Sequence, residues 1–94
     1  MKRTKYKIRM NDGTSKEVEG YVFNNYWGID KRDTGYYILT EIRTGILVDS
    51  SRTQKALKML VQEPEFFDFD PKDRGSYYKI GQAVKLYHDK NGWK

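Results

Sequence analysis

The residues best suited to chemistry lie in one acidic, aromatic segment, EPEFFDFDPKD, at positions 63–73. Asp68, Asp70 and Asp73 form the spacing D-x-D-x-x-D, and closely spaced carboxylates are ligands for Ca²⁺ or Mg²⁺. A calcium loop also needs an oxygen ligand two residues after Asp70 and a Glu at its twelfth position. A lysine occupies each of those two positions. We therefore predict no dedicated metal site and no cofactor.

Two other interpretations of this segment remain open. Its three phenylalanines are too apolar to be left in water together, so at least two should enter the core while the acids keep the loop solvated. Alternatively, an exposed Phe beside carboxylates forms a docking surface for a basic partner protein, or imitates a phosphate backbone. For this second interpretation the candidate contact residues are Phe66, Phe67, Asp68 and Asp70.

A stripe of bases is the second candidate site. Arg52, Lys55 and Lys58 recur at helical spacing, and a basic helix face is typical of nucleic-acid-binding proteins. Aromatic residues alternate with bases near both ends of the chain, and Trp93 is a candidate for stacking on an unpaired base. The alternative is that the stripe is an ordinary solvated helix surface. The sequence contains no recognised nucleic-acid-binding motif.

Catalytic groups are scarce. His88 is the single histidine, near the end of an expected helix, and no hydroxyl or carboxylate lies at a spacing that suggests a catalytic triad. There is no cysteine to act as a nucleophile, and there is neither a G-x-G-x-x-G motif nor a P-loop. We expect a protein that is not an enzyme.

The N-terminal residues predict a β-hairpin. In TKYKIRM, residues 4–10, apolar and basic side chains alternate, as in a half-buried strand. NDG at positions 11–13 is a turn signal, with Gly13 suited to the left-handed conformation. A three-residue loop pairs Lys7 with Glu17, Lys5 with Glu19, and Tyr6 with Val18.

Further strands should follow, with turns at KRDTG (31–35) and RTG (43–45). For the second turn we expect Ile42 to lie opposite Ile46, and Thr40 opposite Val48.

The hydrophobic period then changes from 2 to 3.6. A helix should begin after Ser51, which forms a capping box with Gln54, and should end at Pro64. Thr53, Ala56, Leu57, Leu60 and Val61 would face inward. A second helix is expected over residues 76–90, with Tyr77, Ile80, Val84 and Tyr87 inward, although strands remain an alternative there. The expected fold class is α+β: an antiparallel β-meander of four to five strands packed by one or two C-terminal helices.

Composition limits the class of protein. The 94 residues suit one domain, residues 1–94, and an aromatic content of 15% argues against disorder. The chain has no cysteine, no signal-peptide pattern and no apolar run long enough to span a membrane. We therefore expect a cytoplasmic protein without membrane contact.

The run YWGIDKRDTGYYILTEIRTGILVDSSRTQKALKML, residues 26–60, resembles small accessory proteins of Gram-positive bacteriophages and mobile elements. That group includes anti-CRISPR and other anti-defence inhibitors. The resemblance implies a small, non-catalytic protein that works by binding inside the host cell. Many such inhibitors are acidic and imitate nucleic acid, whereas this chain carries a net charge of +5, so mimicry would be confined to residues 63–73.

The leading hypothesis is therefore a binding protein of phage or mobile-element type that contacts a host protein or nucleoprotein complex through the basic stripe and the acidic segment. One alternative is direct binding of DNA or RNA through the basic stripe. Another is a homodimer that closes through an exposed edge strand.

Overall fold

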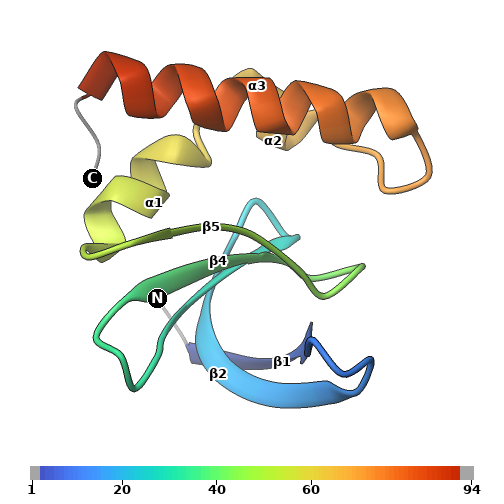
Figure 1. Ribbon diagram of the computed structural model, residues 1–94, viewed down its shortest axis with the longest axis vertical. Coiled ribbons are helices and arrows are strands. Elements are labelled where there is room, and N and C mark those ends of the chain that lie inside the picture. Colours follow the sequence, from blue (N-terminus) through green and yellow to red (C-terminus); the bar gives the residue numbers. More distant parts are fainter. Residues whose placement is uncertain (1–2, 92–94) are drawn as a thin grey trace.

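The computed structural model describes residues 3–91 and confirms the α+β fold, with a five-stranded antiparallel meander followed by helices (Figure 1). The strand order in the sheet is the order in the sequence. The elements are β1 (Arg3–Arg9), β2 (Ser15–Phe23), β3 (Trp27–Lys31), β4 (Tyr37–Glu41), β5 (Ile46–Ser51), α1 (Gln54–Leu60), α2 (Pro64–Phe67) and α3 (Arg74–Asn91).

The first hairpin has the predicted register. Tyr6 pairs with Val18, and the two lysines of β1 each pair with a glutamate of β2. Gly13 closes the turn with a φ of 87°, which glycine adopts without the steric cost that other residues incur. Much of the positive charge of β1 is therefore opposed by acidic side chains across the hairpin.

The predicted register of the β4–β5 hairpin is wrong by one residue next to the turn and holds from Leu39 to Tyr37. Thr40 pairs with Leu47, not Val48, and Ile46 pairs with Glu41, not Ile42. The turn starts one residue early because the Glu41 carboxylate accepts the Thr44 N–H at 3.0 Å and the Glu41 carbonyl accepts the Gly45 N–H at 2.8 Å. An irregularity between Leu39 and Thr40 absorbs the difference.

The sheet is strongly curved, so its first strand returns toward the β4–β5 turn (Figure 1). The backbone N–H of Arg9 donates to the carbonyl of Gly45 at 2.8 Å. Tyr6, Ile8 and Ile38 are buried but lie outside the main core cluster, on the sheet face opposite to the helices. The meander therefore buries side chains on both faces.

The main core lies between the other face of the sheet and the helices, which all cover the same side (Figure 1). Trp27 stands at its centre with no exposed surface, and its indole N–H donates to the Phe66 carbonyl at 2.8 Å. Its other members are Ile29, Leu39, Leu57, Leu60, Val61, Phe66, Phe69, Ile80 and Ala83. No helix in the described part of the chain is long and apolar enough to cross a membrane.

The helical limits differ from prediction at α1. Thr53, not Ser51, is the N-cap: its hydroxyl accepts the Ala56 N–H at 3.3 Å, which removes it from the predicted inward face. Ser51 is instead the buried last residue of β5. Pro64 begins α2 instead of ending α1, because the first helical turn does not need the N–H that proline lacks.

The predicted helix over residues 76–90 is confirmed as α3. Ile80 is buried and Val84 and Tyr87 are half-buried, as expected. Tyr77 is only partly inward, since 40% of its surface is exposed.

Candidate functional site

The structure places Arg52, Lys55 and Lys58 on the outer side of α1 and the residues just before it, and we call these three residues the basic face. All three are exposed. The opposite side of α1 presents Leu57 and Leu60 to the core with no exposed surface. Helix periodicity and burial of these leucines therefore hold Lys55 and Lys58 in solvent, and Arg52 is exposed just before the N-cap Thr53.

Two cations of the basic face lie beside aromatic rings of the sheet. Arg52 Nε donates to the Tyr36 hydroxyl at 3.2 Å, and its guanidinium carbon lies 5.7 Å from the centre of that ring. Lys58 Nζ lies 5.7 Å from the centre of the Phe23 ring. Such distances permit a weak cation–π attraction that favours particular positions of the side chains.

These contacts also orient the basic face on the sheet. Phe23 ends β2 and Tyr36 immediately precedes β4, so the two rings mark opposite ends of the central strands. At the Phe23 end, the Asn24 amide donates to the Val61 carbonyl at 2.8 Å and joins the β2–β3 turn to the end of α1. The three cations therefore form a row along the sheet.

The basic face has no acidic partner among residues 3–91. The ion pairs within that range join Arg3 with Glu19, Arg32 with Asp30, Arg43 with Glu41, and His88 with Asp49. Its three charges are thus not neutralised by an ion pair, whereas in β1 Arg3 pairs with Glu19, and Lys5 and Lys7 lie across the hairpin from glutamates. They remain available to an anionic ligand.

A polar pocket of about 250 Å³ adjoins the start of α1. Tyr21 of β2, Lys31 of β3, Tyr37 of β4 and Gln54 of α1 line it, with Arg3 among the other lining residues. Sequence reasoning missed this pocket, because its walls come from five separate elements. The sequence offered one signal: bases and tyrosines occur at the ends of several strands.

The phenylalanines of the acidic segment divide between the core and the surface. Phe66 is 2% exposed and Phe69 is 7% exposed, which confirms that at least two of the three phenylalanines enter the core. Phe66 is therefore wrong as a contact residue: its ring packs edge-on against Trp27 with centroids 4.8 Å apart. Phe67 is 58% exposed, and Asp68 and Asp70 are exposed.

The carboxylates of the segment line an open depression of about 520 Å³, formed by Glu65, Asp68, Asp70 and Asp73 with Pro64, Ser76 and Lys79. Within residues 3–91 no group of three or more acidic or histidine side chains is arranged to hold a metal ion. Figure 1 shows the connection from α2 to α3 at one end of α3 and α1 below its other end. The acidic and basic surfaces are therefore separate.

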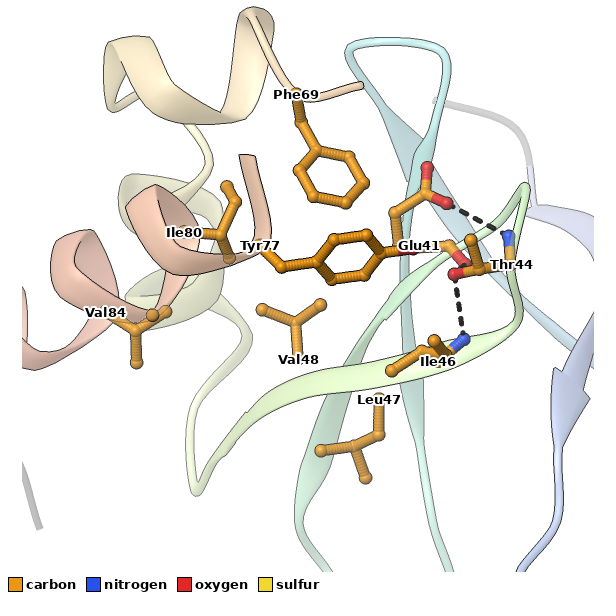
Figure 2. A pocket seen from close by; sticks show the side chains of 10 residues that line it. Glu41, Thr44, Ile46, Leu47, Val48, Phe69, Tyr77, Ile80 and Val84 are labelled. Carbon is orange, nitrogen blue, oxygen red and sulfur yellow. Dashed lines mark hydrogen bonds between the residues drawn. The ribbon is translucent and has the colours of Figure 1, made fainter. Parts of the chain in front are cut away.

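An apolar groove lies between β5 and α3 (Figure 2). Its volume is about 210 Å³, and Ile46, Val48, Tyr77, Ile80 and Val84 provide most of its wall. Tyr77 points into it, and this ring meets Phe69 edge-on with centroids 5.0 Å apart. The groove is a shallow gap in the packing of α3 on the sheet.

Two residues named from the sequence remain. His88 is half-buried, with Nε2 2.8 Å from Asp49 Oδ2, which joins α3 to β5. Trp93 lies outside the described residues.

Comparisons with protein-family models, with curated proteins and with solved structures find no match to this chain. Function must therefore be argued from the surfaces themselves.

Proposed function

We propose that the protein is a non-enzymatic binding protein that engages a nucleoprotein, with the basic face in contact with the nucleic acid. The observation that carries this proposal is the row of three exposed cations without an acidic partner in residues 3–91. Two of them lie beside exposed or half-buried aromatic rings. Bases interleaved with aromatics are the common surface of proteins that bind single strands.

The distribution of charge favours binding of nucleic acid through one local surface over attraction by the net charge of the whole protein. A net charge of +5 gives a modest long-range attraction to phosphate. Much of the charge of β1 is opposed by the acids of β2, and the α2–α3 connection is acidic. The basic face is thus a surface that a phosphate backbone can approach without an opposing carboxylate in an ion pair with its cations.

The acidic segment supports a second contact, with a basic region of the protein component. Phe67 is exposed beside Asp68 and Asp70. Exposure of its apolar ring to water does not stabilise the protein. A partner rich in lysine or arginine would bury this ring and pair with the carboxylates. Together the two surfaces suit an inhibitor of anti-defence type, in keeping with the resemblance of residues 26–60 to phage accessory proteins.

The test of the nucleic-acid contact is fluorescence anisotropy with labelled single-stranded and duplex DNA and RNA at several salt concentrations. A triple variant, Arg52→Ala with Lys55→Ala and Lys58→Ala, should weaken binding to every sequence. Each phosphate contact on a single strand contributes roughly 0.7 to the magnitude of the slope of log affinity against log salt concentration. If all three side chains contact phosphates, the magnitude of that slope should therefore decrease by about 2 in the triple variant. The matched control replaces Lys16, Lys85 and Lys90, which are also exposed, by alanine.

Equal loss of affinity in both triple variants would show that only net charge matters and would contradict the assigned surface. Absence of binding by the unaltered protein at low salt would contradict nucleic-acid contact altogether. The acidic contact has its own assay: a labelled peptide of alternating lysine and glycine should bind the unaltered protein and lose affinity on Asp68→Asn with Asp70→Asn. Unchanged affinity would remove this surface from the proposal.

A further inference from the structure

We infer that the pocket at the start of α1 receives one unpaired base of a single-stranded nucleic acid, an inference that rests on the proposed function. The pocket lies beside the basic face, because Gln54 lines it and the neighbouring Lys55 belongs to that face. A strand whose phosphates follow the basic face would therefore bring its bases to the pocket mouth.

The walls of the pocket include two tyrosines on the same side of the sheet. Tyr21 pairs with Ile29, and Tyr37 pairs with Lys31. Because Ile29 and Lys31 are two residues apart on β3, all four side chains leave the same face. Tyr21 and Tyr37 are separated by one strand and offset by two residues along it, so their Cα atoms lie roughly 12 Å apart. This separation leaves room for a flat ring beside either tyrosine.

The size of the pocket favours a single base. Its volume of about 250 Å³ is roughly eight times the 30 Å³ that a water molecule occupies in the liquid. A pyrimidine or purine has a comparable number of heavy atoms, whereas a base pair has about twice as many. A duplex would therefore have to release a base before the pocket could be used.

The polar groups around the pocket suit a nucleotide. Lys31 Nζ lies over the Tyr37 ring, 5.9 Å from its centre, which places a cation in the pocket wall within reach of a bound nucleotide. Two acids also line the pocket, and each has a cationic partner: Glu19 pairs with Arg3 at 3.5 Å, and Asp30 pairs with Arg32. The Gln54 amide carries both donors and an acceptor, which can meet the edge of a base.

The proposal is tested by comparing two labelled single strands of about ten nucleotides, one with bases and one made entirely of abasic sugar-phosphate units. The unaltered protein should bind the strand with bases about tenfold more tightly, the effect of one stacked base. Tyr21→Leu should abolish this preference and leave the affinity for the abasic strand unchanged. Tyr78→Leu is the control, since Tyr78 on α3 is 70% exposed and does not line the pocket.

A second variant, Tyr37→Leu, covers the case in which Tyr21→Leu impairs folding, which circular dichroism would reveal. Equal affinity of the unaltered protein for both strands would overturn the base site and leave the phosphate contact standing. A preference for bases that persists in the folded Tyr21→Leu and Tyr37→Leu variants would place base contact elsewhere and also overturn it. Absence of binding to either strand would overturn both this inference and the proposed function.

Discussion

The hydroxyl of Tyr6 donates a hydrogen bond to Asp30 Oδ1 at 3.2 Å, across the sheet face opposite to the helices. Tyr6 is 6% exposed and Asp30 is 4% exposed. Arg32 also pairs with the Asp30 carboxylate, so the buried charge has two partners. Burial, followed by the nearby Asp30 charge, raises the pKa of Tyr6 well above its ordinary value of 10.0.

This shift predicts a loss of stability in alkali. Above pH 10 the tyrosine of the unfolded chain ionises while Tyr6 in the folded protein stays protonated, so the folded state binds more protons. The free energy of unfolding then decreases as pH rises, by up to about 1.4 kcal/mol per pH unit for this one group. Tyr6→Phe removes the contribution, so the variant should be less stable than the parent at pH 8, with a smaller difference at pH 11.

Urea unfolding at the two pH values measures this difference. Tyr78→Phe, at an exposed position, is the control for the general effect of tyrosine ionisation. A stability difference between Tyr6→Phe and the parent that is the same at pH 8 and pH 11 would contradict the assigned protonation of Tyr6.

Gly28 gives a second prediction, because the Tyr6 ring lies directly against it. A Cβ at position 28 would lie 2.4 Å from Tyr6 Cζ. Gly28→Ala should therefore lower the free energy of unfolding by about 2 kcal/mol, as overpacking of a core does. The loss should be smaller in a Tyr6→Leu background, and chemical denaturation of all four proteins gives this coupling; equal losses in both backgrounds would contradict the steric cause.

Gly81 should respond in the opposite direction. It lies within α3, borders the apolar groove of Figure 2, and a Cβ there would meet no atom within 4 Å. Gly81→Ala should raise the free energy of unfolding by about 1 kcal/mol, the difference in helix propensity between the two residues. For a domain of this size the melting temperature should rise by roughly 4–8 °C, and a decrease would show that the groove needs glycine.

The buried pair of Glu41 and Arg43 gives a fourth prediction. Glu41 is 1% exposed, and Arg43 Nε lies 2.8 Å from its Oε2. The Arg43 guanidinium also stacks on Tyr26, 3.8 Å from the ring centre, and donates to the Phe69 carbonyl. Arg43→Met should cost about 3 kcal/mol, because it leaves a buried carboxylate without its counter-charge.

Adding Glu41→Gln to Arg43→Met should restore part of this stability. The glutamine carries no charge and still accepts the Thr44 N–H. Thermal unfolding of the single and double variants measures the recovery, and a double variant no more stable than Arg43→Met would show that lost packing, not charge, is the cause.

Phe66 and Phe67 provide the fifth prediction. Phe66→Ala should lower the free energy of unfolding by about 3–5 kcal/mol, since it removes a ring packed on Trp27. Phe67→Ala should change it by less than about 0.5 kcal/mol, because that ring is 58% exposed. A large loss of stability in Phe67→Ala would mean that this side chain is structural and would exclude it from the proposed docking surface.

The residues that could be located from the sequence are those governed by neighbouring positions. Strand alternation and the NDG turn determine the register of Tyr6 and Val18, because a hairpin with a short loop has few alternatives. Helical spacing likewise places Lys55 and Lys58 of the basic face away from the buried Leu57 and Leu60. Both patterns depend on a few neighbouring residues, so the sequence is sufficient to predict their outcome.

The β4–β5 register depended on a contact that the sequence pattern does not contain. From the sequence, Glu41 is a polar residue near the end of a strand. In the structure it is buried, and its carboxylate accepts the Thr44 N–H in the turn. Ser51 and Thr53 are both acceptable helix caps by type, and the point at which β5 ends decides between them. In each case a local preference was nearly balanced and the surrounding structure selected one outcome.

The amino-acid order by itself determined the meander and the exposed row of bases, because periodicity and turn chemistry are properties of short segments, but it left strands as an alternative to a helix for residues 76–90. Only the tertiary structure decided which phenylalanine of the acidic segment is exposed and which tyrosines share a pocket with Lys31 and Gln54. These outcomes depend on how the sheet curves and where the helices cross it. Packing between distant segments determines the curvature of the sheet and the position of the helices, since the apolar side chains must fill one shared core without large gaps.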